Sequence, residues 1–325
     1  MRNTRIRALV LAAGLGTRLR PLTLAVPKPL LPVRGVPILG NALARLAEVG
    51  CEAAAVNLHY LGDAIRRHFG DSYSGLPLTW SEEPEVLGTL GALHPLREFL
   101  APADLVLLVN GDSFCDWPFR ELIDRHLANR WRSTLLLTSW PDPADFGGGV
   151  GIDREGRILS LRAGVPECGE AVSRYAFAGA HVFSPELLVD LKPGKSDIVG
   201  DLYVPMLAAG EAIGSLVDDR PWHDMGTPRR FLDGTLEAGT WVSPEASVDA
   251  AAEVLRSSIE PGAAVEAGAR VEGCVLLPGA RIGAGSVVRE SIVGFGAAIP
   301  PGARVERQIA MPGEDGGADF TPFEG

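Results

Sequence analysis

The chain has 325 residues, of which 46% are apolar and 22% are charged, and its formal net charge is −11. This is the composition of a globular protein with room for two domains, and the acidic balance argues against a nucleic-acid-binding surface. The four cysteines form no CxxC pair and no cysteine–histidine spacing, which excludes a zinc site or a disulfide framework as a prediction. This cysteine pattern fits a reducing, cytoplasmic location. No stretch approaches the ~20 apolar residues of a membrane span, so we expect a soluble protein without a membrane partner.

The first 47 residues are basic although the protein is acidic. They hold eight arginine and lysine side chains and no acidic residue before Glu48. This segregation predicts that the segment binds an anion. The apolar run at residues 8–13 superficially resembles a secretory signal, but it is short and leads through two glycines into Arg18 and Arg20.

From residue 5 to about residue 238, short β-branched or leucine-rich runs alternate with amphipathic segments. The alternation predicts an α/β fold with a Rossmann-like, mostly parallel sheet covered by helices. Strands are predicted at 6–12, 53–58, 105–109 and 134–138, and helices at 38–49, 62–69, 119–129, 185–190 and 198–209. Residues 141–149 and 152–183 suggest an antiparallel excursion, which makes the sheet mixed. Ligands of such folds bind at the carboxyl ends of the strands.

A glycine-rich loop at residues 11–19 follows the first predicted strand. Its glycines allow backbone N–H groups to close on phosphate oxygens, and Arg18 adds a fixed positive charge. The dinucleotide-binding fingerprint requires a third glycine where Leu19 stands, and a Walker loop requires Gly-Lys-Ser/Thr. The sequence therefore favours neither a dinucleotide-binding loop nor a Walker loop.

The loop and the stretch after it, Leu11-Ala-Ala-Gly-Leu-Gly-Thr-Arg-Leu-Arg-Pro-Leu-Thr23 and Pro27-Lys-Pro-Leu-Leu-Pro-Val33, resemble the signature of the sugar nucleotidyltransferase (nucleotide-sugar pyrophosphorylase) family. Only three lysines occur among the 30 basic residues, which favours a functional role for the lysine between two prolines. The resemblance implies that Lys28 contacts the α-phosphate region and that Arg18 contacts the departing pyrophosphate. It also implies a set of nucleotide-binding residues: Leu11, Ala12, Ala13, Gly14, Gly16, Thr17, Arg18, Gly88, Thr89 and Gly111.

Two aspartates are candidates for a metal site. Asp112 follows the apolar run 104–109, and Asp224 lies just before a predicted helix. Each has an ordinary alternative role, as a turn former or a helix cap. The resemblance implies that both hold Mg²⁺, since two carboxylates and bound phosphates complete its octahedral oxygen site, and that Asp112 is catalytic. A sugar 1-phosphate would then attack the α-phosphorus of a nucleoside triphosphate in line, with no protein nucleophile.

The segment 82–93 contains Leu87-Gly-Thr-Leu-Gly91, which resembles the Leu-Gly-Thr-x-Gly segment of mannose-1-phosphate guanylyltransferases. This implies GTP and a mannose-type sugar 1-phosphate as substrates. Many relatives carry a Glu-Lys-Pro lysine for the sugar phosphate, but the corresponding region 158–166 offers only Arg162. Uridylyl or thymidylyl transfer to a glucose, heptose or N-acetylmuramate phosphate therefore stays an alternative. The residues implied to bind the sugar phosphate are Glu83, Gly147, Arg162 and Gly179.

After residue 240, single aliphatic residues recur in steps of 6, 6 and 5, beginning with Val242, Val248, Val254 and Ile259. Three faces therefore repeat every 17 residues, which is a solenoid period. The pattern resembles the hexapeptide-repeat left-handed parallel β-helix. We expect a nucleotidyltransferase domain at 1–240, the β-helix at 241–312 and a disordered tail at 313–325.

The β-helix allows two further readings. Many β-helices of this kind belong to acyltransferases, but acyl transfer generally uses a histidine base, and all six histidines precede the repeats. We therefore expect an oligomerisation or regulatory module and a homo-oligomer. The second reading is a non-catalytic homologue that binds nucleotide sugar, against which the presence of Arg18, Lys28, Asp112 and Asp224 speaks.

Overall fold

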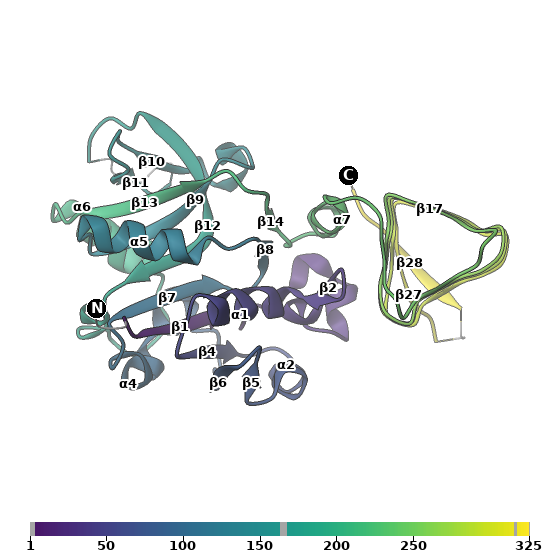
Figure 1. The fold of residues 1–325 in the computed structure, drawn as a ribbon, viewed down its shortest axis with the longest axis horizontal. Coiled ribbons are helices and arrows are strands. Elements are labelled where there is room, and N and C mark those ends of the chain that lie inside the picture. The colour runs from purple at the N-terminus through teal and green to yellow at the C-terminus, as the bar shows by residue number, and fades with distance from the viewer. Residues whose placement is uncertain (1–3, 163–167, 315–316, 325) are drawn as a thin grey trace. The chain divides into compact units, whose positions relative to one another are not determined.

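The computed structural model describes residues 4–162, 168–314 and 317–324. These form two compact units, which are described separately (Figure 1). Unit 1 comprises Met1–Leu15 and Leu39–Trp222, and unit 2 comprises Gly16–Ile38 and His223–Gly325. The glycine-rich loop is therefore shared: its first part belongs to unit 1, whereas Arg18 and Lys28 belong to the unit that also holds the β-helix.

A parallel core forms the centre of unit 1, in the strand order β7-β1-β4-β6. Three of these four strands are apolar because both faces of the sheet are covered there, and Leu9, Ala55 and Leu108 are fully buried. Their bounds are β1 (Ile6–Leu11), β4 (Ala53–Leu58), β6 (Leu76–Glu82) and β7 (Leu105–Asn110). The main helices are α1 (Ile38–Glu48), α2 (Gly62–Phe69) and α5 (Phe119–Asn129), which packs on the strands beyond β7.

Beyond β7 the sheet becomes mixed. The long strand β12 (Ser173–Phe183) runs antiparallel to β7 and to β9 (Ser133–Thr138), and β13 (Ile213–Asp218) runs parallel to β9. The α/β prediction with an antiparallel excursion is confirmed. The shorter elements of unit 1 are β5 (Ser72–Tyr73), α3 (Gly88–Gly91), α4 (Arg97–Leu100), β8 (Ser113–Cys115), β10 (Val150–Ile152) and β11 (Ile158–Ser160).

Some elements of unit 1 differ from the expectation. β6 and β13 are not predicted, because polar residues alternate along β6 and Gly214 interrupts β13. Residues 185–190 form only a 3₁₀ turn, Pro185–Leu188. The segment expected as one helix over 198–209 begins as a π-helix, Val199–Tyr203, and continues as α6 (Val204–Ala208), where Pro205 lacks the N–H that a regular helix needs.

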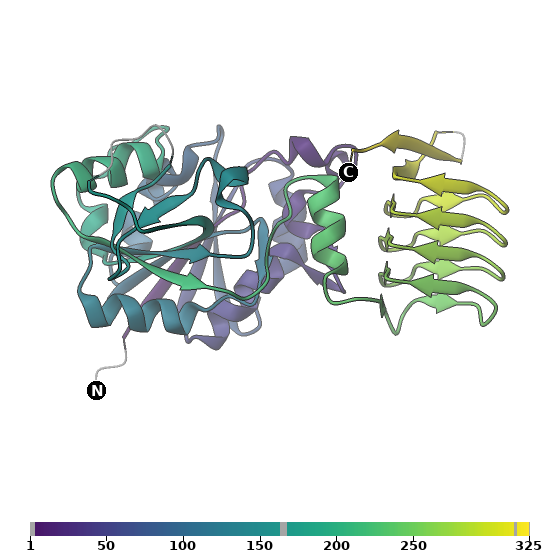
Figure 2. The same ribbon diagram turned by 90° about the horizontal axis from the view of Figure 1, so that it is seen from above.

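Unit 2 contains a parallel β-helix, which confirms the repeat-based prediction. Figure 1 looks down the axis of the β-helix and shows the triangular outline of its coils, and Figure 2 shows the stacked coils from the side. Each strand pairs with the one 17 residues further on, as in Val242↔Ile259 and Ile259↔Leu276. The strands of the three faces are β15 (Trp241–Val242), β18 (Ser258–Ile259), β21 (Val275–Leu276), β24 (Ile292–Val293) and β27 (Gln308–Pro312); β16 (Ser247–Val248), β19 (Ala264–Val265), β22 (Arg281–Ile282) and β25 (Ala298–Ile299); β17 (Glu253–Leu255), β20 (Arg270–Glu272), β23 (Val287–Arg289) and β26 (Arg304–Glu306).

The remaining elements of unit 2 precede and follow these coils. The hairpin β2 (Pro32–Val33) and β3 (Val36–Pro37) comes from the N-terminal segment, and α7 (Pro228–Leu236) leads into the first coil. β14 (Trp222–Asp224) spans the boundary between the units. The tail, expected to be disordered from residue 313, contains β28 (Ala318–Pro322), which pairs antiparallel with β27 because the last coil leaves that edge open. In the described part of the chain, no helix has both the length and the apolar character needed to cross a membrane.

Hydrogen bonds link three buried polar side chains in unit 1. The hydroxyl of Tyr203 lies 3.0 Å from the Ser133 hydroxyl and 3.0 Å from Nδ1 of His181. Burial lowers the pKa of His181 from its ordinary value of 6.5 to about 3. The imidazole is therefore neutral in the folded protein at neutral pH.

The free energy of unfolding should decrease as the pH is lowered from about 6.5 to about 3, because in this window the unfolded chain binds a proton at His181 that the folded protein does not. We expect His181→Asn, whose amide oxygen can replace Nδ1, to flatten this dependence by up to about 1.4 kcal/mol per pH unit. Urea denaturation between pH 4 and pH 7 measures the slope, with exposed His68→Asn as the control. Equal slopes in His181→Asn and the wild type would contradict this origin.

Candidate functional site

The first part of the glycine-rich loop and Asp112 follow two neighbouring strands of unit 1 at the same edge of the sheet. β1 and β7 are parallel neighbours in which Leu11 pairs with Asn110, and the Gly111 N–H donates to the Leu11 carbonyl at 2.9 Å. A side chain at position 111 would collide with that carbonyl, since a Cβ atom would lie 2.8 Å from it. The half-buried Asp112 follows directly.

Three consecutive backbone N–H groups of the loop have no hydrogen-bond acceptor in the described part of the chain. Within residues 4–162, 168–314 and 317–324, the N–H groups of Ala13, Gly14 and Leu15 donate no hydrogen bond, and Gly14 and Leu15 are exposed. By contrast, the neighbouring Ala12 N–H donates to Oδ1 of Asn57 at 2.8 Å. A loop with adjacent unsatisfied donors can bind an anion such as a phosphate group.

A buried network joins this loop to the segment after β6. Asn57 donates from Nδ2 to Oε1 of Glu83 at 2.8 Å, and the Leu87 N–H donates to Oε2 of the same carboxylate at 2.9 Å. Nδ1 of His59 lies 2.7 Å from the Glu83 carbonyl oxygen. Glu83 is only 4% exposed. Because its buried carboxylate accepts from both Asn57 and the Leu87 N–H, it fixes the segment after β6 relative to the end of β4.

Glu83→Gln should lower the free energy of unfolding by about 1–3 kcal/mol, because the amide presents one acceptor where the carboxylate presents two, and a buried donor loses its partner. Thermal unfolding without ligands measures this effect. The matched control is Glu82→Gln, whose side chain is 66% exposed. If Glu83 served the sugar phosphate alone, the stability of the ligand-free protein would not change and only the KM for that substrate would rise.

The next segment, Leu87–Gly91, is held by residues 194–198. The carbonyl of Ser196 accepts from the N–H groups of Leu90 and Gly91, and the Thr89 hydroxyl donates to Asp197 and accepts from the Ile198 N–H. Gly88 has φ +80°, and a Cβ atom there would lie 2.5 Å from the Ser196 carbonyl. The Thr89 hydroxyl is thus engaged within the protein, and among the described residues only the N–H groups of Gly88 and Thr89 in this segment donate no hydrogen bond.

The four residues predicted for the sugar phosphate have different surroundings. Gly179, at φ +87° in β12, packs against Asn110, whose Cβ would be 3.0 Å from a Cβ added to the glycine. Gly147 ends the 3₁₀ turn Pro143–Phe146, and no atom lies within 4 Å of where its Cβ would stand. Arg162 is exposed, and residues 163–167, which the sequence prediction included, lie outside the described residues. Among the described residues no hydrogen bond or ion pair joins Arg162 to Glu83, Gly147 or Gly179.

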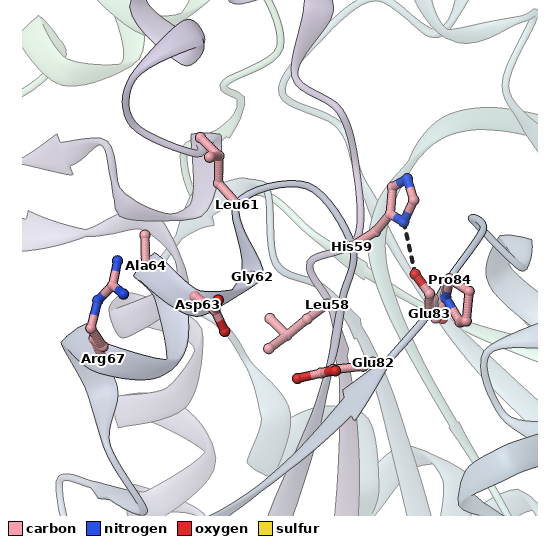
Figure 3. Close-up of a pocket in the computed structure, with 10 residues that line it drawn as sticks. All are labelled: Leu58, His59, Leu61, Gly62, Asp63, Ala64, Arg67, Glu82, Glu83 and Pro84. Carbon is pink, nitrogen blue, oxygen red and sulfur yellow. Dashed lines mark hydrogen bonds between the residues drawn. The ribbon is translucent and has the colours of Figure 1, made fainter.

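A pocket of about 510 Å³ lies at the carboxyl ends of β4 and β6, bordered by the first turns of α2 (Figure 3). Its wall includes His59, Asp63 and Arg67, and Figure 3 shows the contact between His59 and the Glu83 carbonyl at one side. The side chains that line the pocket therefore carry both negative and positive charge. Since β4 is the parallel neighbour of β1, the pocket lies at the same edge of the sheet as the first part of the glycine-rich loop.

In unit 2, Lys28 is the one buried side chain among the described lysines and arginines, at 6% exposure. Its Nζ lies 3.9 Å from Oδ1 of Asp224, whose Oδ2 accepts from Arg230 at 2.5 Å. The backbone around it is compact, since a Cβ at Gly16 (φ +61°) would lie 3.4 Å from the Lys28 Cβ. The sequence does not predict a role for Arg230, because nothing distinguishes it from the adjacent Arg229 or from the other arginines of this arginine-rich chain.

Arg18 completes this cluster. It is exposed, yet its Nη2 lies 2.8 Å from the point where a Gly226 Cβ would stand, and Oδ1 of Asp224 lies 2.7 Å from the same point. Thr17 is also exposed. Unit 2 therefore gathers the predicted residues Arg18, Lys28 and Asp224.

The chemistry of the donors suits Mg²⁺. The described residues contain no group of three or more histidine, cysteine or acidic side chains that could hold a metal ion by themselves. Mg²⁺ does not require one, because it is usually held by one or two carboxylates together with substrate phosphates and water. Asp112 and Asp224 each offer such a carboxylate.

Comparison with known proteins yields two family matches. Residues 7–239 match the model described as Nucleotidyl transferase, and residues 236–317 match the GMPPB C-terminal domain. The mannose-1-phosphate guanylyltransferase of Mycobacterium tuberculosis is 32% identical over 277 residues, covering 84% of this chain and 75% of that protein. The mannose-1-phosphate guanyltransferase of Yarrowia lipolytica is 33% identical, covering 75% and 68%, and the probable mannose-1-phosphate guanylyltransferase 1 of Oryza sativa is 30% identical, covering 89% and 86%.

Among solved structures, HddC from Yersinia pseudotuberculosis has the same fold with a TM-score of 0.59 and 21% sequence identity. The match covers 71% of this chain and 99% of HddC, and a complex of HddC with GMP-PN matches equally well.

Proposed function

The chain belongs to the nucleotidyl transferase family, and we propose that it joins GTP to a mannose-type sugar 1-phosphate to give a nucleotide sugar and pyrophosphate. Transfer of a nucleotidyl group to a sugar 1-phosphate is the reaction of this family. The preference for guanine and mannose is supported by the names of three relatives at 30 to 33% identity and by the Leu87–Gly91 segment.

The observation that carries this proposal is the buried Lys28, paired with Asp224 beside the glycine-rich loop. A buried ammonium group is costly unless its charge serves a partner, and a second cation, Arg230, already neutralises Asp224. Within unit 2, Arg18, Lys28 and Arg230 thus bring positive charge to the surroundings of Asp224. Such a charge suits a triphosphate.

In the proposed reaction, an oxygen of the sugar phosphate attacks the α-phosphorus in line, and pyrophosphate leaves. The N–H groups of Ala13, Gly14 and Leu15 bind phosphate oxygens, Lys28 binds the α-phosphate and Arg18 binds the pyrophosphate. Asp112 and Asp224, which we propose as ligands, would hold Mg²⁺, and the bound metal would supply positive charge to the phosphates. Positioning and neutralisation supply the catalysis, so no protein nucleophile is required.

We further propose where the rest of the substrates bind. The nucleotide contacts the remaining loop and strand-end residues, with the base against the backbone of residues 87–89: Leu11, Ala12, Gly16, Thr17, Gly88, Thr89 and Gly111. The sugar phosphate contacts the residues Glu83, Gly147, Arg162 and Gly179. In this arrangement Arg162 supplies the cation that relatives obtain from the Glu-Lys-Pro lysine.

The β-helix suggests self-association. Large apolar side chains are exposed on its strands and on β28: Val242, Leu255 and Phe320 are 41%, 45% and 44% exposed. We propose a homo-oligomer in the cytoplasm, where the four free cysteines would stay reduced. Light scattering after size-exclusion chromatography measures the mass, and a monomer at micromolar concentration would refute self-association.

A matrix of nucleotides and sugars tests the substrate assignment. Pyrophosphate release is measured with GTP, UTP, dTTP, ATP and CTP against mannose, glucose, heptose and N-acetylmuramate 1-phosphates. We expect the highest kcat/KM for GTP with mannose 1-phosphate. Preference for UTP or dTTP would replace the guanylyl assignment but keep the reaction class. If no combination released pyrophosphate but the protein still bound nucleotide sugar, the protein would be a regulatory homologue.

A further inference from the structure

Among the described lysine, arginine, aspartate and glutamate residues, three side chains are buried: Lys28, Glu83 and Glu260. The first two belong to segments for which substrate binding is proposed. Glu260 instead follows β18 in the β-helix and has no exposed surface. The other coils carry small or apolar residues at the equivalent position in the 17-residue repeat: Ser243, Leu277, Gly294 and Met311.

The carboxylate of Glu260 binds the turn of the β2–β3 hairpin. The Arg34 N–H donates to Oε1 at 2.9 Å, and the Gly35 N–H donates to Oε2 at 2.7 Å. Both turn residues have positive φ, at 54° and 80°, as a tight two-residue hairpin turn requires. The Ser258 hydroxyl donates to Oε1 at 2.8 Å, so each carboxylate oxygen is engaged.

The same hairpin is held from two other directions within unit 2. The guanidinium of Arg34 donates to the carbonyl of Gly239 at 2.7 Å, just beyond α7. The indole ring of Trp241 packs against Gly35, since a Cβ there would lie 3.2 Å from its Cη2 atom. The turn is therefore fixed by the residues that lead into the β-helix and by Glu260 in its second coil.

The hairpin continues directly into the segment that carries Lys28. The Leu31 N–H donates to the Lys28 carbonyl at 3.0 Å, and the Leu31 carbonyl accepts from the Ile38 N–H at 3.1 Å, where the hairpin closes. Leu31 itself is fully buried. A displacement of the hairpin would therefore move the backbone of Lys28.

We infer that Glu260 is a positioning residue, by which the β-helix fixes the hairpin and, through it, the Lys28 ammonium group. The inference rests on the phosphate-binding role proposed for Lys28. Through this contact the β-helix positions Lys28, in addition to any part in assembly.

Stability alone does not explain a glutamate at this position. Burial raises the pKa of Glu260, although hydrogen bonds from Ser258, Gly35 and Arg34 oppose this effect, so the charged form is held at a cost. An apolar residue such as the Leu277 of the next coil would avoid that cost. Only the carboxylate supplies two acceptors to the two N–H groups of the turn.

The test combines hydrogen exchange with kinetics on the full-length protein. Glu260→Ala should raise amide exchange in residues 28–38 at least about tenfold, while exchange in residues 264–300 stays unchanged. It should also lower kcat about ten- to hundredfold at saturating substrates, since small displacements of a catalytic group have effects of this size. Glu260→Gln, which keeps one acceptor oxygen, should fall between Glu260→Ala and the wild type. The exposed Glu245→Ala in the first coil is the control.

A second variant acts from the hairpin side and leaves the β-helix intact. Arg34→Ala removes the bonds to Gly239 and Thr235 and should change exchange and kcat in the same direction. Unchanged exchange in residues 28–38 of Glu260→Ala would overturn the inference, and so would faster exchange with an unchanged kcat. A wild type without turnover would instead refute the proposed function, and faster amide exchange in residues 28–38 of Glu260→Ala would still show that Glu260 fixes the hairpin.

Discussion

Lys28→Met is expected to lower kcat/KM for nucleotide-sugar formation by about 10³-fold or more. The substitution removes the single buried lysine charge beside the glycine-rich loop but keeps most of the side-chain volume. A preorganised charge in a water-poor site typically contributes two to three orders of magnitude to a transfer reaction. Because Asp224 retains its contact with Arg230, the carboxylate is not left unpaired and the fold should survive.

Steady-state pyrophosphate release measures this effect, with thermal unfolding as the check on folding. The matched control is Lys192→Met, which changes the same residue type at an exposed position and should keep wild-type activity. A Lys28→Met enzyme within tenfold of the wild type would mean that the buried lysine is structural. The role proposed for Glu260 would fall with it.

Asp112→Asn is expected to reduce turnover at least about 10³-fold, because an amide cannot supply the negative charge that a metal ligand contributes. The backbone should not change, since Gly111 holds the strand end through its bond to Leu11. Binding of Mn²⁺ in the presence of nucleotide, followed by paramagnetic resonance, should weaken in parallel. This second readout separates loss of the metal from loss of another function.

Asp124→Asn is the control for this substitution, because Asp124 is exposed on α5. If Asp112→Asn lost turnover but bound Mn²⁺ as the wild type does, Asp112 would act on the substrate and not as a metal ligand. The same comparison with Asp224→Asn tests the second proposed ligand separately.

Much of the fold is predictable because its signals are local. The bounds of α2 and α5 agree with the expected ranges, since both are short amphipathic helices between clear strands. The 6-6-5 spacing predicts the β-helix because each coil repeats one inward aliphatic residue, as the fully buried Ile259, Leu276 and Val293 illustrate. β6 escapes prediction because it alternates buried and exposed residues near the edge of the sheet.

The site is predictable only in part. Lys28 stands out because lysine is rare in a chain rich in arginine. The contacts that position the site join distant residues: Ala12 and Asn57 are 45 positions apart, and Arg34 and Glu260 are 226 positions apart. No sequence period connects such pairs. The one sequence signal for Glu260 is its charge at a position where the other coils carry small or apolar residues.

The complete reaction of the purified protein with GTP, mannose 1-phosphate and Mg²⁺ decides whether the chain is a guanylyltransferase. We expect nucleotide sugar and pyrophosphate to form in equal amounts, to disappear when Mg²⁺ is chelated, and to be converted back to GTP when pyrophosphate is added in excess. Binding of nucleotide sugar without any pyrophosphate formation, with this or another pair of substrates, would contradict the claim and identify a protein that recognises the product without making it.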